Sequence, residues 1–124
     1  MRALKERSPF IPEVHLFHNR DKFAKFFKRT YGTIPELCDD AGAQAWCDNG
    51  VACVLVQYGV DDRITEYSLL VHEAWHVIEM HYAWLGEEHV GGEFAAYGVQ
   101  VVSDALMRAQ KRWRKGKGKC RKRS

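Results

Sequence analysis

The sequence predicts a small α+β domain in which a short antiparallel or mixed sheet packs against two long helices. The 124 residues leave room for a single domain. Stretches rich in β-forming residues all precede residue 60, and apolar residues recur at helical spacing after residue 65. The predicted order of elements is therefore β-α-β-β-α-α.

The first part of the chain predicts a strand followed by a helix. Residues 10–17 are rich in β-forming side chains, although Pro12 weakens a strand at that point. Asn19 is a favourable N-cap residue, and phenylalanines recur at helical spacing after it. Gly32 suits the position that follows a helix. We therefore expect a helix from about residue 20 to residue 30.

An Asn-Gly pair predicts a β-hairpin in the middle of the chain. Residues 33–42 have the composition of a loop. After them, residues 43–47 and 51–58 flank an Asp-Asn-Gly turn at 48–50. The second arm is a nearly continuous run of β-forming residues, so we expect it to lie inside the sheet.

Two long helices are expected in the second half. Thr65 is a plausible N-cap for a helix over residues 66–84. Gly86 follows that helix, and two glycines precede a second helix over residues 92–110. These glycines allow the chain to reverse direction, so we expect the two helices to pack antiparallel.

The first of these helices carries a candidate zinc site. Residues 72–76 read His-Glu-Ala-Trp-His, and histidines four residues apart lie on the same face of a helix. His72 and His76 can therefore both bind one zinc ion, while Glu73 stands beside the metal as the general base for a zinc-activated water. The alternative is a chance pair of surface histidines, but the apolar residues around them favour a buried site.

A catalytic zinc site needs a third protein ligand, for which Glu93 is the best candidate. It lies near the start of the second helix, and Tyr97 follows one turn later on the same face, where it could assist catalysis as a hydrogen-bond donor. His89 is a weaker candidate for the same hydrogen-bonding role. Asp104 is a weaker candidate for accepting a hydrogen bond from the far side of a zinc-binding imidazole. His81 is expected to point away from the two histidines.

Residues 69–77, Leu-Leu-Val-His-Glu-Ala-Trp-His-Val, and residues 91–100, Gly-Gly-Glu-Phe-Ala-Ala-Tyr-Gly-Val-Gln, carry a family resemblance. They resemble a group of small bacteriophage and prophage proteins with an HExxH helix, which look like minimal gluzincins. The resemblance implies a zincin-like fold, zinc as the cofactor, His72, His76 and Glu93 as ligands, Glu73 as the base, and a phage origin. It implies no particular substrate.

We expect a zinc-dependent metallopeptidase acting on a peptide or protein substrate. In zincins, an edge strand above the active-site helix pairs with the extended substrate, and residues 52–58 or 43–47 are placed to do so here. The alternative is a weak or inactive zincin-fold protein that binds nucleic acid or serves phage assembly or host interaction. Replacing Glu73 by Gln separates the two, because only the first function depends on it.

The charge distribution is strongly uneven. Residues 111–124 carry nine basic side chains and no acidic ones, whereas the first 110 residues have a net charge of −6. We expect a single metal-binding domain over residues 1–110 followed by a disordered basic tail over 111–124. The tail is a candidate nucleic-acid-binding segment, and its alternative role is that of a solubilising extension. It could also deliver the peptidase to a nucleoprotein target.

The remaining features suggest a cytoplasmic protein, in a bacterial host cell if it is phage-encoded. The start of the chain does not resemble a signal peptide, and no apolar stretch is long enough to span a membrane. The four cysteines form no Cys-x-x-Cys pair, so we expect free thiols. A Cys47–Cys53 disulfide is the minor alternative.

Overall fold

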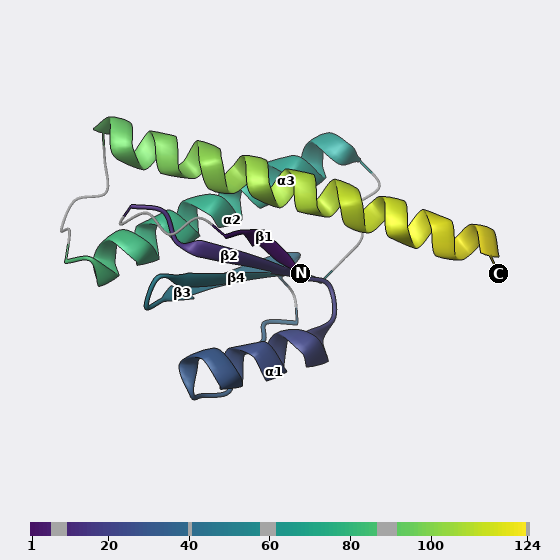
Figure 1. The fold of residues 1–124 in the computed structure, drawn as a ribbon, viewed down its shortest axis with the longest axis horizontal. Helices are drawn as coiled ribbons and strands as arrows, with labels where there is room; N and C mark the ends of the chain where they lie inside the picture. Colours follow the sequence, from purple (N-terminus) through teal and green to yellow (C-terminus); the bar gives the residue numbers. More distant parts are fainter. Residues whose placement is uncertain (6–9, 40, 58–61, 87–91, 124) are drawn as a thin grey trace.

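A computed structural model describes residues 1–5, 10–39, 41–57, 62–86 and 92–123, with side chains as far as residue 116. Figure 1 shows a sheet with α1 on one side and with α2 and α3 on the other. The elements are β1 (Arg2–Leu4), β2 (Glu13–Phe17), α1 (Arg20–Tyr31), β3 (Ala43–Asp48), β4 (Val51–Val56), α2 (Arg63–Trp84) and α3 (Gly92–Arg123). The predicted α+β class is confirmed.

The sheet is mixed and has the strand order β1-β2-β4-β3. β2 and β4 are parallel, while the β1–β2 and β3–β4 pairs are antiparallel. β4 therefore lies inside the sheet, as its apolar sequence predicts. β1 is the one strand that the sequence analysis missed, because its three residues are too few for any alternating pattern.

The two faces of β4 contribute to two separate cores. Ala52 and Val54 pack with residues of α2 and α3, whereas Cys53 and Leu55 pack with phenylalanines of α1. This alternation follows from the two-residue period of a strand. It also places Cys47 and Cys53 on opposite faces, and both are free thiols, so the alternative disulfide is not formed.

Local signals for α1 and the hairpin are confirmed. The side chain of Asn19 accepts a hydrogen bond of 3.0 Å from the backbone N–H of Lys22, and Gly32 ends the helix with φ 78°. At the hairpin turn, Asn49 and Gly50 have φ values of 54° and 75°. A two-residue turn with two positive φ angles is the type that Asn-Gly favours.

α2 begins earlier than predicted. Its N-cap is Asp62 rather than Thr65, because an Asp62 carboxylate oxygen accepts a hydrogen bond of 3.1 Å from the backbone N–H of Ile64. The Thr65 hydroxyl donates to the other carboxylate oxygen at 2.8 Å. The threonine thus supports the aspartate cap instead of forming its own.

α2 and α3 pack antiparallel, as expected. Ile78 of α2 lies against Gly98 of α3, and Glu66 near the start of α2 binds residues near the end of α3. Among the described residues, no helix combines the length and apolarity needed to cross a membrane.

α3 does not end at residue 110 but continues as a helix to Arg123. The helix is therefore 13 residues longer than the predicted 92–110, and the division into a domain of residues 1–110 and a disordered tail stays a prediction. Two residues of the expected tail contact the domain: the ring of Trp113 stacks on His18 at 3.8 Å, and Arg114 forms an ion pair with Glu66. These contacts fix the helix to the rest of the chain beyond residue 110, and the basic composition of the segment does not predict them.

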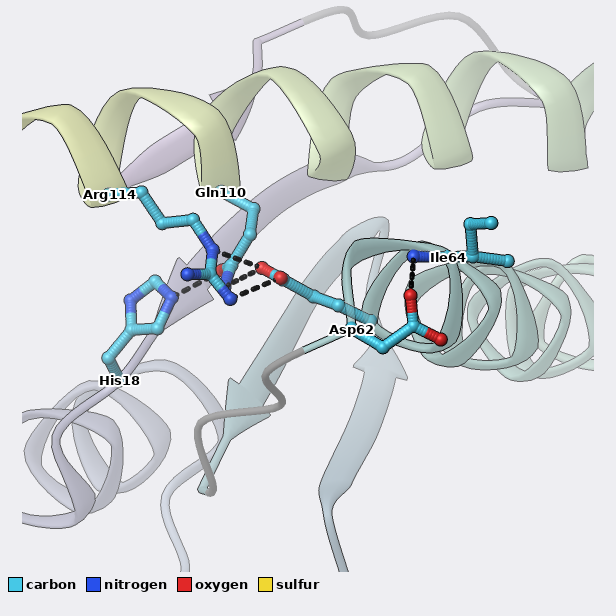
Figure 2. A network of polar contacts seen from close by, with 6 residues as sticks. His18, Asp62, Ile64, Gln110 and Arg114 are labelled. Carbon is cyan, nitrogen blue, oxygen red and sulfur yellow. Dashed lines mark hydrogen bonds and ion pairs between the residues drawn. The ribbon is translucent and has the colours of Figure 1, made fainter.

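The contact between the two helix ends is a buried polar network. Figure 2 shows Gln110 and Arg114 reaching from α3 toward the start of α2, with His18 beside them. The Gln110 side-chain amide nitrogen donates to the Glu66 carboxylate, and the Gln110 amide oxygen accepts a hydrogen bond from His18 Nε2. Arg114 donates to both carboxylate oxygens of Glu66. Glu66 is only 2% exposed, so these donors replace the water that it loses.

Candidate metal centre

The structure brings His72 and His76 together on α2. Their Nε2 atoms are 3.0 Å apart, and the rings meet edge to face with centroids 4.7 Å apart. His72 is exposed and His76 is half-buried. Two imidazoles bound to one tetrahedral zinc ion would place their nitrogens about 3.3 Å apart. The pair therefore has nearly the spacing of a chelate without any change in the helix.

Glu79 lies behind His76. One of its carboxylate oxygens is 3.6 Å from His76 Nδ1, one helical turn along α2. A carboxylate near Nδ1 favours the proton on that nitrogen, which leaves Nε2 free as a ligand. Glu79 is not among the residues predicted for the site, although its spacing of three residues from His76 places it on the same face of a helix.

Glu73 is a buried residue that lies between the two histidines in sequence. It is 4% exposed, and burial raises the pKa of its carboxyl group, while nearby His76 and His72 act in the opposite direction. The predicted base is thus on the same helix as the histidines and is shielded from bulk water. Its position follows from the helix alone, since it adjoins His72 in sequence.

Glu93 and Tyr97 are not brought to the histidine pair. Both are exposed on α3. α3 contacts α2 at Ile78, which is two residues and so about 200° around the helix from His76. The two helices are antiparallel as predicted, but α3 packs on the opposite side of α2 from the histidines. Among the described residues, no group of three His, Cys, Asp or Glu side chains could hold a metal ion.

The weaker candidates also lie apart from the pair. His81 is 2% exposed and stacks on Trp84, with ring centroids 5.7 Å apart. Asp104 pairs with Arg108 at 2.9 Å along α3 rather than with an imidazole. His89 lies outside the described residues.

β3 is the outer strand beside α2. Leu69 lies 3.4 Å from the position of a Cβ atom on Gly42, just before β3, and Trp84 approaches Gly50, just after it. α2 and β3 thus run alongside each other over their length. Of the two strands expected to offer an edge, β4 is internal, and within the described chain β3 pairs with β4 alone. Of these two strands, β3 is therefore the one whose outer edge no other described strand covers.

A cavity of about 410 Å³ lies on the other face of β3. Its wall is largely apolar and is formed by α1, the following loop and β3, including Phe23, Phe27, Ile34, Pro35, Gln44 and Trp46. Because α1 covers the face of the sheet opposite to α2, this cavity is separate from the histidine pair. It does adjoin the same strand.

No protein-family model, curated protein or solved structure matches the chain. Its chemistry is therefore inferred from the arrangement of its own residues: two convergent imidazoles, a buried carboxyl group on the same helix, and the edge of β3, with which no further described strand pairs.

Proposed function

We propose that the chain binds a zinc ion through His72 and His76 and hydrolyses peptide bonds, with Glu73 as the general base. The observation that carries the proposal is the convergence of the two Nε2 atoms to 3.0 Å. The Glu79 carboxylate behind His76 Nδ1 supports it, because metal-binding histidines commonly have such a partner.

Zinc, when bound, supplies a Lewis acid that activates water and polarises a carbonyl group. The chain itself supplies the proton transfer. Glu73 would accept a proton from the attacking water and pass it to the leaving amine. Its 4% exposure keeps bulk water from competing for that proton.

An extended peptide paired with the free edge of β3 is the proposed substrate. The backbone of β3 would form hydrogen bonds with any such peptide, so the pairing itself requires no particular sequence. Alternate side chains of a paired strand point to opposite faces of a sheet. One set would face the side of the histidines, and the other set would face the apolar cavity beside Trp46. We therefore expect a preference for large apolar residues.

The third zinc ligand stays a prediction. Glu93 would reach the histidines only if α3 turned relative to α2, because the two helices now meet at Ile78 and Gly98. The two-histidine proposal does not depend on Glu93. The cytoplasm, as a reducing compartment, is the proposed location, and the free thiols of Cys38, Cys47 and Cys53 support it.

Zinc content of the purified protein, measured by elemental mass spectrometry, tests the metal site. We expect about one zinc per chain in the wild type and at least about tenfold less zinc in His76→Ala, because one of the two ligands is lost. His15→Ala is the matched control, because His15 pairs with Glu13 and packs on Phe26, on the α1 face of the sheet. A folded wild-type protein without zinc would exclude the proposal.

Hydrolysis of a quenched-fluorescence peptide library tests the catalytic part separately. Glu73→Gln should keep the zinc and lower the rate at least about 100-fold, because the base is lost while both imidazoles remain. Equal rates for the two proteins would rule out Glu73 as the base. Loss of zinc in Glu93→Gln would show that α3 turns toward the histidines when zinc binds, whereas retention supports the helix arrangement described above.

A further inference from the structure

The basic segment of the chain is a continuation of α3. Its backbone is helical to Arg123, and Figure 1 shows this yellow end of α3 projecting beyond the other elements. We call residues 111–123 the basic arm. A helix of 13 residues is about 20 Å long, so the arm has the dimensions of a separate binding surface.

Two neighbouring residues fix the base of the arm to the domain. Trp113 stacks on His18 with the ring planes within 5° of parallel, and Arg114 binds the buried carboxylate of Glu66. Arg114 is therefore already paired with a carboxylate, and Trp113, the one aromatic residue of the arm, is already stacked on another ring. Lys111, Arg112 and Lys115 are exposed around the same turns. The arm therefore begins as an anchored helix with Lys111, Arg112 and Lys115 exposed to solvent.

The charge of the arm is not neutralised by its own sequence. Besides Arg114 it carries eight basic residues and no acidic one: Lys111, Arg112, Lys115, Lys117, Lys119, Arg121, Lys122 and Arg123. The first 110 residues have a net charge of −6. A polyanion is thus attracted to the arm and repelled by the rest of the chain.

We propose that the basic arm binds double-stranded DNA through its phosphates, without reading the base sequence. An α-helix with its side chains is about 10–12 Å wide, which fits the major groove of B-DNA at about 12 Å. Cations on several sides of the helix can then contact both phosphate backbones. The release of condensed counterions supplies the affinity.

Other polyanions fit the arm less well. Insertion of a helix into a lipid surface needs an apolar face, but the arm's one large apolar residue, Trp113, is already stacked on His18. Stacking on single-stranded bases also needs exposed aromatic rings. Duplex RNA has a deep, narrow major groove that excludes a helix. Duplex DNA is therefore the favoured partner.

Fluorescence anisotropy with a labelled 20-base-pair duplex, titrated between 50 and 200 mM salt, tests the proposal on the full chain. Binding should weaken with a slope of log affinity against log salt of about −4 or steeper. Replacing Lys111, Arg112 and Lys115 by Gln should make the slope shallower by about three and weaken binding at least about thirtyfold at 100 mM salt.

The matched control replaces Lys22, Lys25 and Lys28 by Gln. These three lysines are exposed on α1, so the control removes the same charge from a different surface. It should leave the slope unchanged, and circular dichroism should show that both variants are folded. Equal losses in the two variants would assign the binding to net charge alone and overturn the proposal.

Three further outcomes would also overturn it. They are the absence of binding at 50 mM salt, tighter binding to single-stranded DNA, and tighter binding to vesicles of anionic phospholipid. His76→Ala should leave the DNA affinity unchanged, since the histidine pair lies on α2, away from the arm. The DNA-binding experiment therefore tests the basic arm independently of the proposed peptidase activity.

Discussion

Two buried glutamates on α2 illustrate how partners decide the state of a side chain. Glu66 and Glu73 are two helical turns apart and are 2% and 4% exposed. Burial by itself acts to raise the pKa of both carboxyl groups. For Glu66, hydrogen bonds from Arg114 and Gln110 and the charges of Arg114 and Arg63 outweigh burial, so its pKa is lowered. Glu73 lacks a cation of that kind, and its pKa stays raised.

The lowered pKa of Glu66 predicts a loss of stability in acid. A group whose pKa is lower in the folded state stabilises it above the unfolded pKa, here 4.5, and this contribution disappears as the pH falls through the folded value. Glu66→Gln should lower the free energy of unfolding by about 1–3 kcal/mol at pH 7, because Arg114 loses its charged partner while staying one-third exposed. Urea unfolding at pH 7 and at pH 3 measures both effects.

The difference between wild type and Glu66→Gln should shrink at pH 3, where the wild-type carboxylate is being protonated. Asp39→Asn is the control, since Asp39 pairs with Arg20 on the exposed surface. Such a pair contributes little to stability. A difference between wild type and Glu66→Gln that does not depend on pH would argue against the ionised Glu66 as its cause.

At the level of elements, the contact between α2 and α3 depends on the absence of a side chain. A Cβ atom on Gly98 would lie 2.9 Å from Ile78 Cδ1, closer than such atoms normally approach. Ile78 is fully buried, so it has little room to move away. Gly98 thus permits the close packing that places α3 on the side of α2 opposite to the histidines.

Gly98→Ala should therefore destabilise the protein by about 1 kcal/mol, because the cost of overpacking exceeds the gain in helix propensity. In an Ile78→Val background, which removes the crowded methyl group, the same change should stabilise it by up to about 1 kcal/mol. Denaturant unfolding of the four proteins in this cycle gives the values. The same effect of Gly98→Ala in both backgrounds would show that Ile78 does not crowd this position.

At the level of the whole molecule, three layers are joined at one end by the polar network. His18 lies between β2 and α1, Glu66 begins α2, and Gln110 and Arg114 belong to α3. The network therefore connects the helix on one face of the sheet with the two helices on the other. Through this contact, Trp113 and Arg114, which lie past residue 110, pack against the rest of the chain.

Truncation tests where the folded unit ends. A chain ending after Gln110 should lose at least about 3 kcal/mol of unfolding free energy, because it buries Glu66 without its arginine and loses the Trp113 stack. A chain ending after Gly116 keeps both contacts and should stay within about 1 kcal/mol of the full chain. Equal stability of the two truncated chains would support the predicted domain boundary at residue 110.

The sequence by itself determined the features that depend on near neighbours. Asn19, Gly32 and the Asn49-Gly50 turn act through bonds and dihedral angles within a few residues, so their patterns predicted α1 and the hairpin. The approach of His72 to His76 is of the same kind, since a spacing of four residues brings two side chains together on any α-helix. The proposal that α2 carries the metal site therefore needed no tertiary information.

Only the tertiary structure decided how the elements combine. The side of α2 on which α3 packs separates Glu93 from the histidines, and the strand order makes β3 rather than β4 the free edge. The packing also pairs Arg114, a residue of the expected tail, with Glu66. These outcomes depend on contacts between residues far apart in the chain. The fit of side chains decides which of these contacts form, and the spacing of residues along the sequence does not predict it.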